Sequence, residues 1–189
     1  MSTRKMIILA LFTALSVLLI ALVHFPLLPA APWLEFDLGD VPILLASLLY
    51  GPLAGLIVTV IASVIQAYTV SAQSGVYGMI MHILASGTMA LVAGGLFRVT
   101  EKSSWRMIFR LVFSFVTAAL ALIAVMVPAN LLVTPLFIGQ SAKEILPLIP
   151  AAVVPFNALK GIINAVAVSA LYLALYKRIL PILHARAQK

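Results

Sequence analysis

The sequence predicts an all-α integral membrane protein in which six transmembrane helices are joined by long irregular loops on the outer face. Of the 189 residues, 64% are hydrophobic and 9% are charged, whereas a soluble domain has roughly 25% charged residues. Apolar stretches of about 20 residues, the length that crosses a bilayer as a helix, recur along the chain. Basic residues gather at the chain ends and in one loop. We therefore expect one transmembrane domain over residues 1–189.

The expected helices are separated by proline, glycine and charged residues. Three prolines between positions 26 and 32 exclude a regular helix there, and Gly51-Pro52 breaks the chain again. Asp40 is expected to cap the short helix that follows it, and Pro128 should kink the fifth helix. The six helices are predicted at about 5–24, 41–50, 53–70, 76–97, 107–133 and 154–179.

The distribution of charge predicts the orientation of the chain. Cytoplasmic loops are rich in lysine and arginine, so six helices with both termini in the cytoplasm are favoured. Ten of the twelve basic residues then lie inside: Arg4, Lys5, Arg98, Lys102, Arg106, Arg110, Lys177, Arg178, Arg186 and Lys189. The acidic residues Glu35, Asp37, Asp40 and Glu144 are placed outside. Because the basic residues follow the membrane topology, we expect them to contact lipid headgroups. Their distribution argues against nucleic-acid binding.

The last predicted helix carries the most informative polar pattern. Asn157, Lys160, Gly161 and Asn164 share one helical face. A lysine inside a transmembrane segment costs about 2.5–3.5 kcal/mol, so it persists where it meets water, a partner or a ligand. Lys160 either reaches out to the lipid headgroups or lines a pocket. The two asparagines beside it favour the pocket.

Other polar residues are expected in the same outer half of the bundle. Asn130 and Thr134 lie one turn apart on the fifth helix, where they either bond another helix or contact a ligand. His82, on the fourth helix, is either a packing residue or a ligand contact. We find no paired carboxylates at membrane depth, Ser-His-Asp set or metal-ligand spacing, so we predict no catalytic residue, metal or cofactor. A few donors on apolar walls suit a flat heterocycle with polar edges.

Small residues mark a second surface. Ala10 and Ala14 form a small-x-x-x-small pattern on the first helix, which lets another helix approach closely. We expect this face to dock a partner. Ala90 and Gly94 repeat the spacing on the fourth helix, where internal packing is expected instead.

Four segments resemble the riboflavin-specific S components of energy-coupling factor (ECF) transporters. The most specific is 155–161 (PFNALKG), which is similar to their last-helix motif P-F-N-x-x-K-G. The others are 34–42 (LEFDLGDVP), 51–55 (GPLAG) and 176–181 (YKRILP). The resemblance implies an S-component fold that binds riboflavin from outside with high affinity. It also implies a transmembrane T component and two ATPase subunits as partners, in the plasma membrane of a prokaryote.

The resemblance also implies roles for individual residues. Asn157, Lys160 and Asn130 match positions expected to contact the flavin. Ala10 and Ala14 would dock the T component, and the apolar outer loop around Leu28 and Trp33 would cover the ring. His82 stands where the family pattern has asparagine, which leaves a contact from the fourth helix open.

Three alternatives remain at this point. The first is an S component for another vitamin, such as thiamine or a queuosine precursor. The second is a small intramembrane enzyme that acts on lipids, which the shortage of carboxylates and nucleophiles disfavours. The third is a membrane scaffold, which would tolerate loss of the polar stripe on the last helix.

Overall fold

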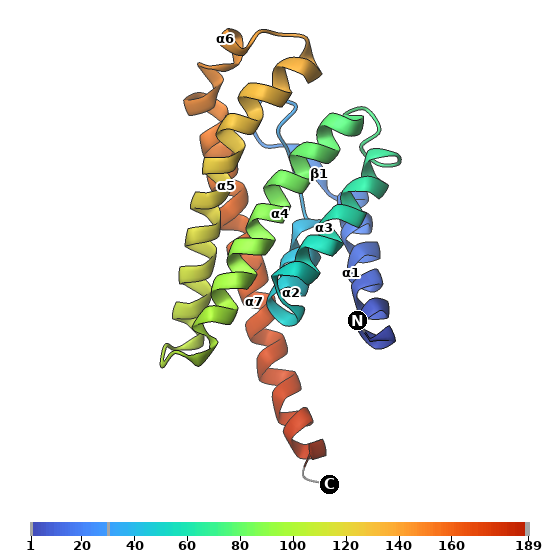
Figure 1. Cartoon of the computed structure of the whole chain (residues 1–189), viewed down its shortest axis with the longest axis vertical. Helices are drawn as coiled ribbons and strands as arrows, with labels where there is room; N and C mark the ends of the chain where they lie inside the picture. The colour runs from blue at the N-terminus through green and yellow to red at the C-terminus, as the bar shows by residue number, and fades with distance from the viewer. Residues whose placement is uncertain (1, 30, 188–189) are drawn as a thin grey trace.

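The structure, a computed structural model, describes residues 2–29 and 31–187, with side chains described as far as Arg178. Long helices form a single bundle (Figure 1). Its principal helices are α1 (Thr3–Leu22), α2 (Asp40–Tyr50), α3 (Pro52–Ala67), α4 (Gly75–Val99), α5 (Met107–Ile138) and α7 (Val154–Ala187). Within the described part of the chain, α1, α4, α5 and α7 are long and apolar enough to cross a membrane, whereas α2 and α3 are shorter.

The two ends of the bundle differ in the segments that they carry. The N-terminus, the α4–α5 loop and the C-terminus lie toward one end, which we call the inner end (Figure 1). The opposite, outer end carries the four-residue helix α6 (Ala142–Ile145) (Figure 1). This arrangement brings the predicted basic clusters to the same end, although the side chains of Arg186 and Lys189 lie outside the described residues.

Helix α5 is longer than the sequence predicted. It runs to Ile138, with Pro128 and Pro135 both inside it, instead of ending near residue 133. Neighbouring helices and local adjustments compensate for a missing backbone donor in a membrane helix, so proline is a weak stop signal there. Gly139 ends the helix in the left-handed conformation with φ 70°. The segment between the predicted fifth and sixth helices, 134–153, therefore contains the end of α5, α6 and a π-helical turn, η2 (Ile149–Val153).

The connection between α1 and α2 forms a small antiparallel ribbon that the sequence did not predict. Strand β1 (His24–Pro26) pairs with β2 (Glu35–Asp37), and Phe25 lies opposite Phe36. Pro26 ends β1, and Pro29 and Pro32 lie between the two strands, so the sequence indicated an irregular loop here. The strand β2 leads the chain back into the bundle toward the start of α2.

Helix α2 forms the centre of the main apolar core, since every residue from Val41 to Leu48 is buried. Eleven residues rise only about 16 Å, roughly half the hydrocarbon thickness. At its inner end, α2 stops at Gly51, whose φ of 100° favours glycine. Lys5 Nζ on α1 donates to the carbonyl of Tyr50, the last residue of α2, at 3.3 Å. Because the inner end is fixed there, the first residue of α2, Asp40, lies deep inside the bundle.

Close packing of α2 against α4 depends on small residues. Ser47 Oγ donates to the Ala90 carbonyl at 2.6 Å, and a Cβ at Gly94 would overlap that hydroxyl. Ala90 and Gly94 are both buried. The internal packing predicted for this pair is confirmed.

Candidate functional site

A cavity of about 450 Å³ occupies the outer half of the bundle, between the ribbon and helices α3, α4, α5 and α7. We call it the outer cavity. Its volume lies in the range of small-molecule sites, roughly 300–1,000 Å³. Six of the predicted ligand-binding residues line it: Trp33, His82, Asn130, Thr134, Asn157 and Lys160.

The polar stripe on α7 faces the interior of the bundle. Asn157, Lys160 and Asn164 are all buried, and Lys160 is only 4% exposed. Lys160 therefore does not extend to the lipid headgroups, which answers the first alternative for this residue. Asn164 lies about two turns from Asn157 and does not line the outer cavity. Gly161 has a packing role, because a Cβ there would lie 2.8 Å from Ala119 on α5.

Lys160 is held by two carboxylates that the sequence analysis placed on the outer surface. Its Nζ lies 3.1 Å from Asp40 Oδ2 and 3.9 Å from Asp37 Oδ2. Asp37 is 7% exposed and Asp40 is 0% exposed. The prediction that the pocket lacks paired carboxylates is wrong, and so is the capping role given to Asp40. The cap residue of α2 is Gly39, and the Asp40 carboxylate faces α7 and α4 instead.

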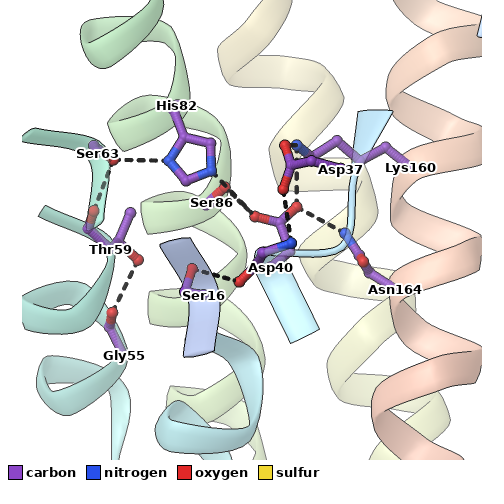
Figure 2. A network of polar contacts seen from close by, with 11 residues as sticks. Ser16, Asp37, Asp40, Gly55, Thr59, Ser63, His82, Ser86, Lys160 and Asn164 are labelled. Carbon is purple, nitrogen blue, oxygen red and sulfur yellow. Dashed lines mark hydrogen bonds and ion pairs between the residues drawn. The ribbon is translucent and has the colours of Figure 1, made fainter. Parts of the chain in front are cut away.

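Asp40 is the hub of a buried polar network (Figure 2). Asn164 Nδ2 donates to its Oδ2 at 2.8 Å, and Ser86 Oγ donates to its Oδ1. Asn164 thus positions the carboxylate that pairs with Lys160. A buried ion pair keeps its strength only when further hydrogen bonds satisfy its remaining atoms, which these neighbours do for Asp40.

The backbone before α2 is fixed so that both carboxylates point inward. Gly39 N donates to Asp37 Oδ1 at 2.8 Å, and Ser16 Oγ on α1 donates to the Gly39 carbonyl at 2.8 Å. A Cβ at Gly39 would overlap Ile20, so α1 and this turn are in contact without room for a larger residue. Irregular backbone at membrane depth is tolerated where it is buried in protein, as it is here.

His82 links this network to α3 (Figure 2). Its Nδ1 lies 2.7 Å from Ser63 Oγ, and its Nε2 lies 3.6 Å from Asp40 Oδ1. Ser63 Oγ also lies 2.7 Å from the Thr59 carbonyl, to which it can donate. His82 is therefore packed into the bundle and also lines the outer cavity, and its contact with a ligand stays a prediction.

Asn130 and Thr134 bond within α5 and not across to another helix. Asn130 Nδ2 donates to the Met126 carbonyl at 2.8 Å, and Thr134 Oγ1 donates to Asn130 Oδ1 at 3.0 Å. Both residues are buried and line the outer cavity. Within the described part of the chain, Asn130 makes no hydrogen bond to another helix, so the interhelical bond considered for it is not found.

The apolar outer loop contributes unequally. Trp33 lines the outer cavity, and its Nε1 is buried without a hydrogen-bond partner among the described residues. Leu28 instead packs against a second apolar cluster that includes Phe36 and Val153. Leu28 is therefore not among the residues that line the outer cavity, and its predicted contact with a ligand stays a prediction.

Several polar atoms of the cavity-lining residues lack a partner. Besides Trp33 Nε1, the buried atoms Gln66 Oε1, His82 Nε2 and Asn157 Oδ1 have no hydrogen-bond partner within the described chain. Buried polar groups are nearly always paired, so a group of unpaired atoms on one cavity indicates a place where a polar ligand or water binds. This set contains acceptors as well as donors.

Carboxylate and imidazole atoms of Asp37, Asp40 and His82 lie within 4.8 Å of one another, a spacing that one cation could reach. The ammonium of Lys160 already contacts both carboxylates. A metal ion placed there would face this positive charge at close range. We therefore interpret the cluster as an ion-pair network belonging to the cavity.

Sequence reasoning missed Asp37, Asp40, Ser63 and Ser86 as members of the site. Two signals were present. The helix at 41–50 is too short to cross a bilayer, so one of its two ends must lie inside the bundle, and Asp40 stands at one of these ends. Thr59, Ser63 and Gln66 follow the same i, i+4, i+7 spacing that singled out the last helix.

A second feature lies on the other side of the bundle, between α1 and α3. Ala10 and Ala14 are exposed and line a shallow apolar groove, which we call the α1–α3 groove. Its remaining lining residues are Met6, Leu9, Thr13, Ile57, Ile61 and Ile65. The small residues leave room for a side chain from another helix.

Comparison with known proteins decides the family. The model of the family described as ECF transporter, substrate-specific component, matches residues 4–172. The chain belongs to this family. Relatives of this S component include the riboflavin transporter FmnP of Bacillus subtilis, 26% identical with 93% of each chain covered. Another is the riboflavin transporter RibU of Staphylococcus aureus, 27% identical, with 93% of this chain and 90% of that protein covered.

Solved structures agree with the family assignment. The structure of the S component of a bacterial ECF transporter covers 94% of this chain and 98% of its own, with a TM-score of 0.74 and 25% identity. The resemblance inferred from the sequence motifs is confirmed. This S component is a transport protein of a prokaryotic membrane and not an enzyme.

Proposed function

We propose that this S component binds riboflavin in the outer cavity and presents it for uptake by an ECF transporter. The observation that carries the proposal is Lys160, a buried ammonium on the wall of a cavity large enough for a small heterocycle. Relatives that cover over nine-tenths of the chain are riboflavin transporters, which supports this ligand over other vitamins.

The chemistry of the cavity wall suits a flavin. The isoalloxazine ring is flat and largely apolar, with carbonyl acceptors and an imide donor at one edge, and the ribityl chain carries hydroxyls. Lys160 donates to a ring carbonyl, and the free Oδ1 of Asn157 accepts from the imide or a hydroxyl. Trp33 offers an indole face and an unpaired Nε1 from the outer loop. Asn130 and Thr134 complete the polar edge of the site.

The membrane arrangement is part of the proposal. All six principal helices lie in the bilayer, with the inner end in the cytoplasm and the outer cavity facing the exterior. The 34-residue α7 is long enough to cross the bilayer and continue beyond it. Arg98 on α4 and Lys5 on α1 both lie beside the inner end of α2. These basic residues are then placed at the cytoplasmic headgroups, in agreement with the positive-inside rule.

The partners are also proposed. A T component docks on the α1–α3 groove, where Ala10 and Ala14 allow close helix packing. Two ATPase subunits supply the energy through that T component. In lipid, close packing drives helix association, so the fit of small residues decides the strength of this contact.

Riboflavin binding is tested with the purified full-length chain. We expect the protein to copurify with a yellow, fluorescent ligand that mass spectrometry identifies as riboflavin. After the ligand is removed, calorimetry should show saturable binding of riboflavin, with thiamine as the matched negative control. Protein that ignores riboflavin, or prefers thiamine, contradicts the proposal.

Docking is tested by filling the α1–α3 groove. Ala10→Leu and Ala14→Leu should abolish copurification of the T component and the ATPases while riboflavin binding to the isolated chain persists. Ala21→Leu, an exposed position on the same helix outside the groove, is the matched control. Equal loss of the partners in the control would argue against the groove as the docking site.

A further inference from the structure

His82 has an oxygen atom beside each of its ring nitrogens. Ser63 Oγ lies 2.7 Å from Nδ1, and Asp40 Oδ1 lies 3.6 Å from Nε2. A neutral imidazole carries a hydrogen on one nitrogen, and an imidazolium carries one on both. Two oxygen acceptors, one of them a carboxylate, are therefore the surroundings that suit the doubly protonated ring.

The hydroxyl of Ser63 strengthens this interpretation. It has a single hydrogen, and the Thr59 carbonyl at 2.7 Å is available to accept it. Ser63 Oγ then accepts from Nδ1–H of His82, which in the neutral ring leaves Nε2 as a bare lone pair. That lone pair faces the Asp40 carboxylate, and Nε2 has no hydrogen-bond partner among the described residues. A proton on Nε2 replaces this repulsion with a charge-assisted contact.

The charges around His82 do not cancel when its ring is neutral. The charged groups that face it are Asp40 from α2, Asp37 from β2 and Lys160 from α7. Helices α3 and α5 present neutral polar groups only, and the remaining titratable residues of the cavity wall are His24, Glu35 and Tyr77. Two carboxylates and one ammonium give a buried net charge of −1, and a proton on His82 brings the cluster to zero.

We propose that His82 is a proton-binding site that fills when a neutral ligand occupies the outer cavity. The inference rests on the proposed function for the identity of that ligand. Riboflavin carries no charge near neutral pH, so it displaces water from the cluster without compensating its negative charge. Burying an uncompensated charge is costly, and uptake of one proton removes that cost. The complex then binds more protons than the free protein, so affinity rises as pH falls.

Proton uptake is measured by calorimetry of riboflavin binding to the full-length chain near pH 7. The binding enthalpy in phosphate and in Tris, which differ in ionisation enthalpy, gives the number of protons taken up. We expect net uptake of up to about one proton per riboflavin, since histidine titrates in this range. The dissociation constant should fall by up to about tenfold per pH unit on acidification within the histidine range.

Two variants identify the histidine that takes up the proton. His82→Asn keeps a polar side chain that cannot titrate, so the riboflavin that this variant binds should enter without proton uptake, whatever the change in affinity. His24→Asn removes the other histidine of the cavity wall and should leave the uptake unchanged. Uptake that persists in His82→Asn, or disappears in His24→Asn, overturns the assignment.

The wild-type measurement tests whether riboflavin binding takes up a proton even if His82→Asn does not fold. Riboflavin binding with no exchanged proton, or with proton release, overturns the inference and leaves the proposed function standing. Absence of riboflavin binding overturns both. Uptake in the wild-type chain that His24→Asn retains supports the inference.

Discussion

Two buried cations, Lys160 in the outer half and Arg110 at the inner end, have their charges compensated by different groups. Arg110 donates to the Phe97 carbonyl at 2.9 Å and the Thr100 hydroxyl at 3.4 Å, and its guanidinium lies 4.4 Å from the centre of the Phe97 ring. These contacts anchor α5 to the end of α4. Lys160 instead pairs with Asp40 and lies on a cavity wall.

The difference shows that burial of a charge does not by itself mark a binding site. Arg110 is satisfied by a backbone carbonyl, a hydroxyl and an aromatic face at the end of a helix, where cations are favoured. Its role is structural. Lys160 is held in place by carboxylates that are themselves held by hydrogen bonds, and its position on the cavity wall leaves it accessible to a ligand.

The largest expected effect comes from removing the charge that compensates Lys160. Asp40→Asn leaves that ammonium without its nearest carboxylate, so we expect the free energy of unfolding to fall by about 3–5 kcal/mol. Thermal unfolding in detergent measures this loss. Glu35→Gln, an exposed carboxylate on the same wall, is the control and should change stability by less than about 0.5 kcal/mol. Equal stability of the two variants would contradict the claim that Asp40 compensates the buried charge of Lys160.

A direct contrast between the two cations follows. Lys160→Met should weaken riboflavin binding by about 10- to 100-fold, because a charge-assisted hydrogen bond contributes roughly 1.5–3 kcal/mol. Arg110→Met should lower the unfolding temperature and leave the affinity within about twofold of the wild type. Fluorescence titration with riboflavin measures both. A comparable loss of affinity in Arg110→Met would show that the inner end also shapes the site.

Packing at the core between the two regions gives a smaller effect. Gly94→Ala places a Cβ against Ser47 on α2, and this overpacking should cost about 1–3 kcal/mol of stability. Gly95→Ala has no neighbouring atom within 4 Å and should be neutral or slightly stabilising. The difference in thermal unfolding between these adjacent positions tests the α2–α4 contact.

The smallest effect is expected at the outer surface, where Glu144 caps α6. Hydrogen bonds from the backbone N–H and the hydroxyl of Ser141 lower the pKa of the Glu144 carboxyl. The stabilisation is complete above the pKa of a free glutamate and is lost as pH falls through the lowered value. The protection factors of the α6 amides, which are the exchange rates corrected for the intrinsic rate at each pH, should therefore fall on acidification. In Glu144→Gln, that pH dependence should disappear, and an unchanged profile would contradict the cap.

The helical period made part of the site predictable from sequence. Asn157, Lys160 and Asn164 share a face whatever the rest of the fold does, because spacing along a helix is a local property. The inward direction of that face followed from the cost of exposing polar groups to lipid. The family motifs predicted the S-component fold.

The partners of those residues were not predictable in the same way. Asp40 meets Asn164 across 124 positions, a pairing set by how α2 enters the bundle. The acidic residues follow a proline-rich loop, so they were assigned to the surface by local context. The end of α5 could be given only approximately for a related reason. Proline ends most helices in water, but Pro135 is accommodated inside this membrane helix.

The distance along the chain between Asp40 and its partners has a consequence for biosynthesis. A ribosome delivers α2 to the membrane long before it has made α7, so the nascent chain carries an uncompensated carboxylate in the meantime. A product truncated before the last helix keeps that defect permanently. The same carboxylate that organises the finished protein thus makes its buried network depend on synthesis of the last helix.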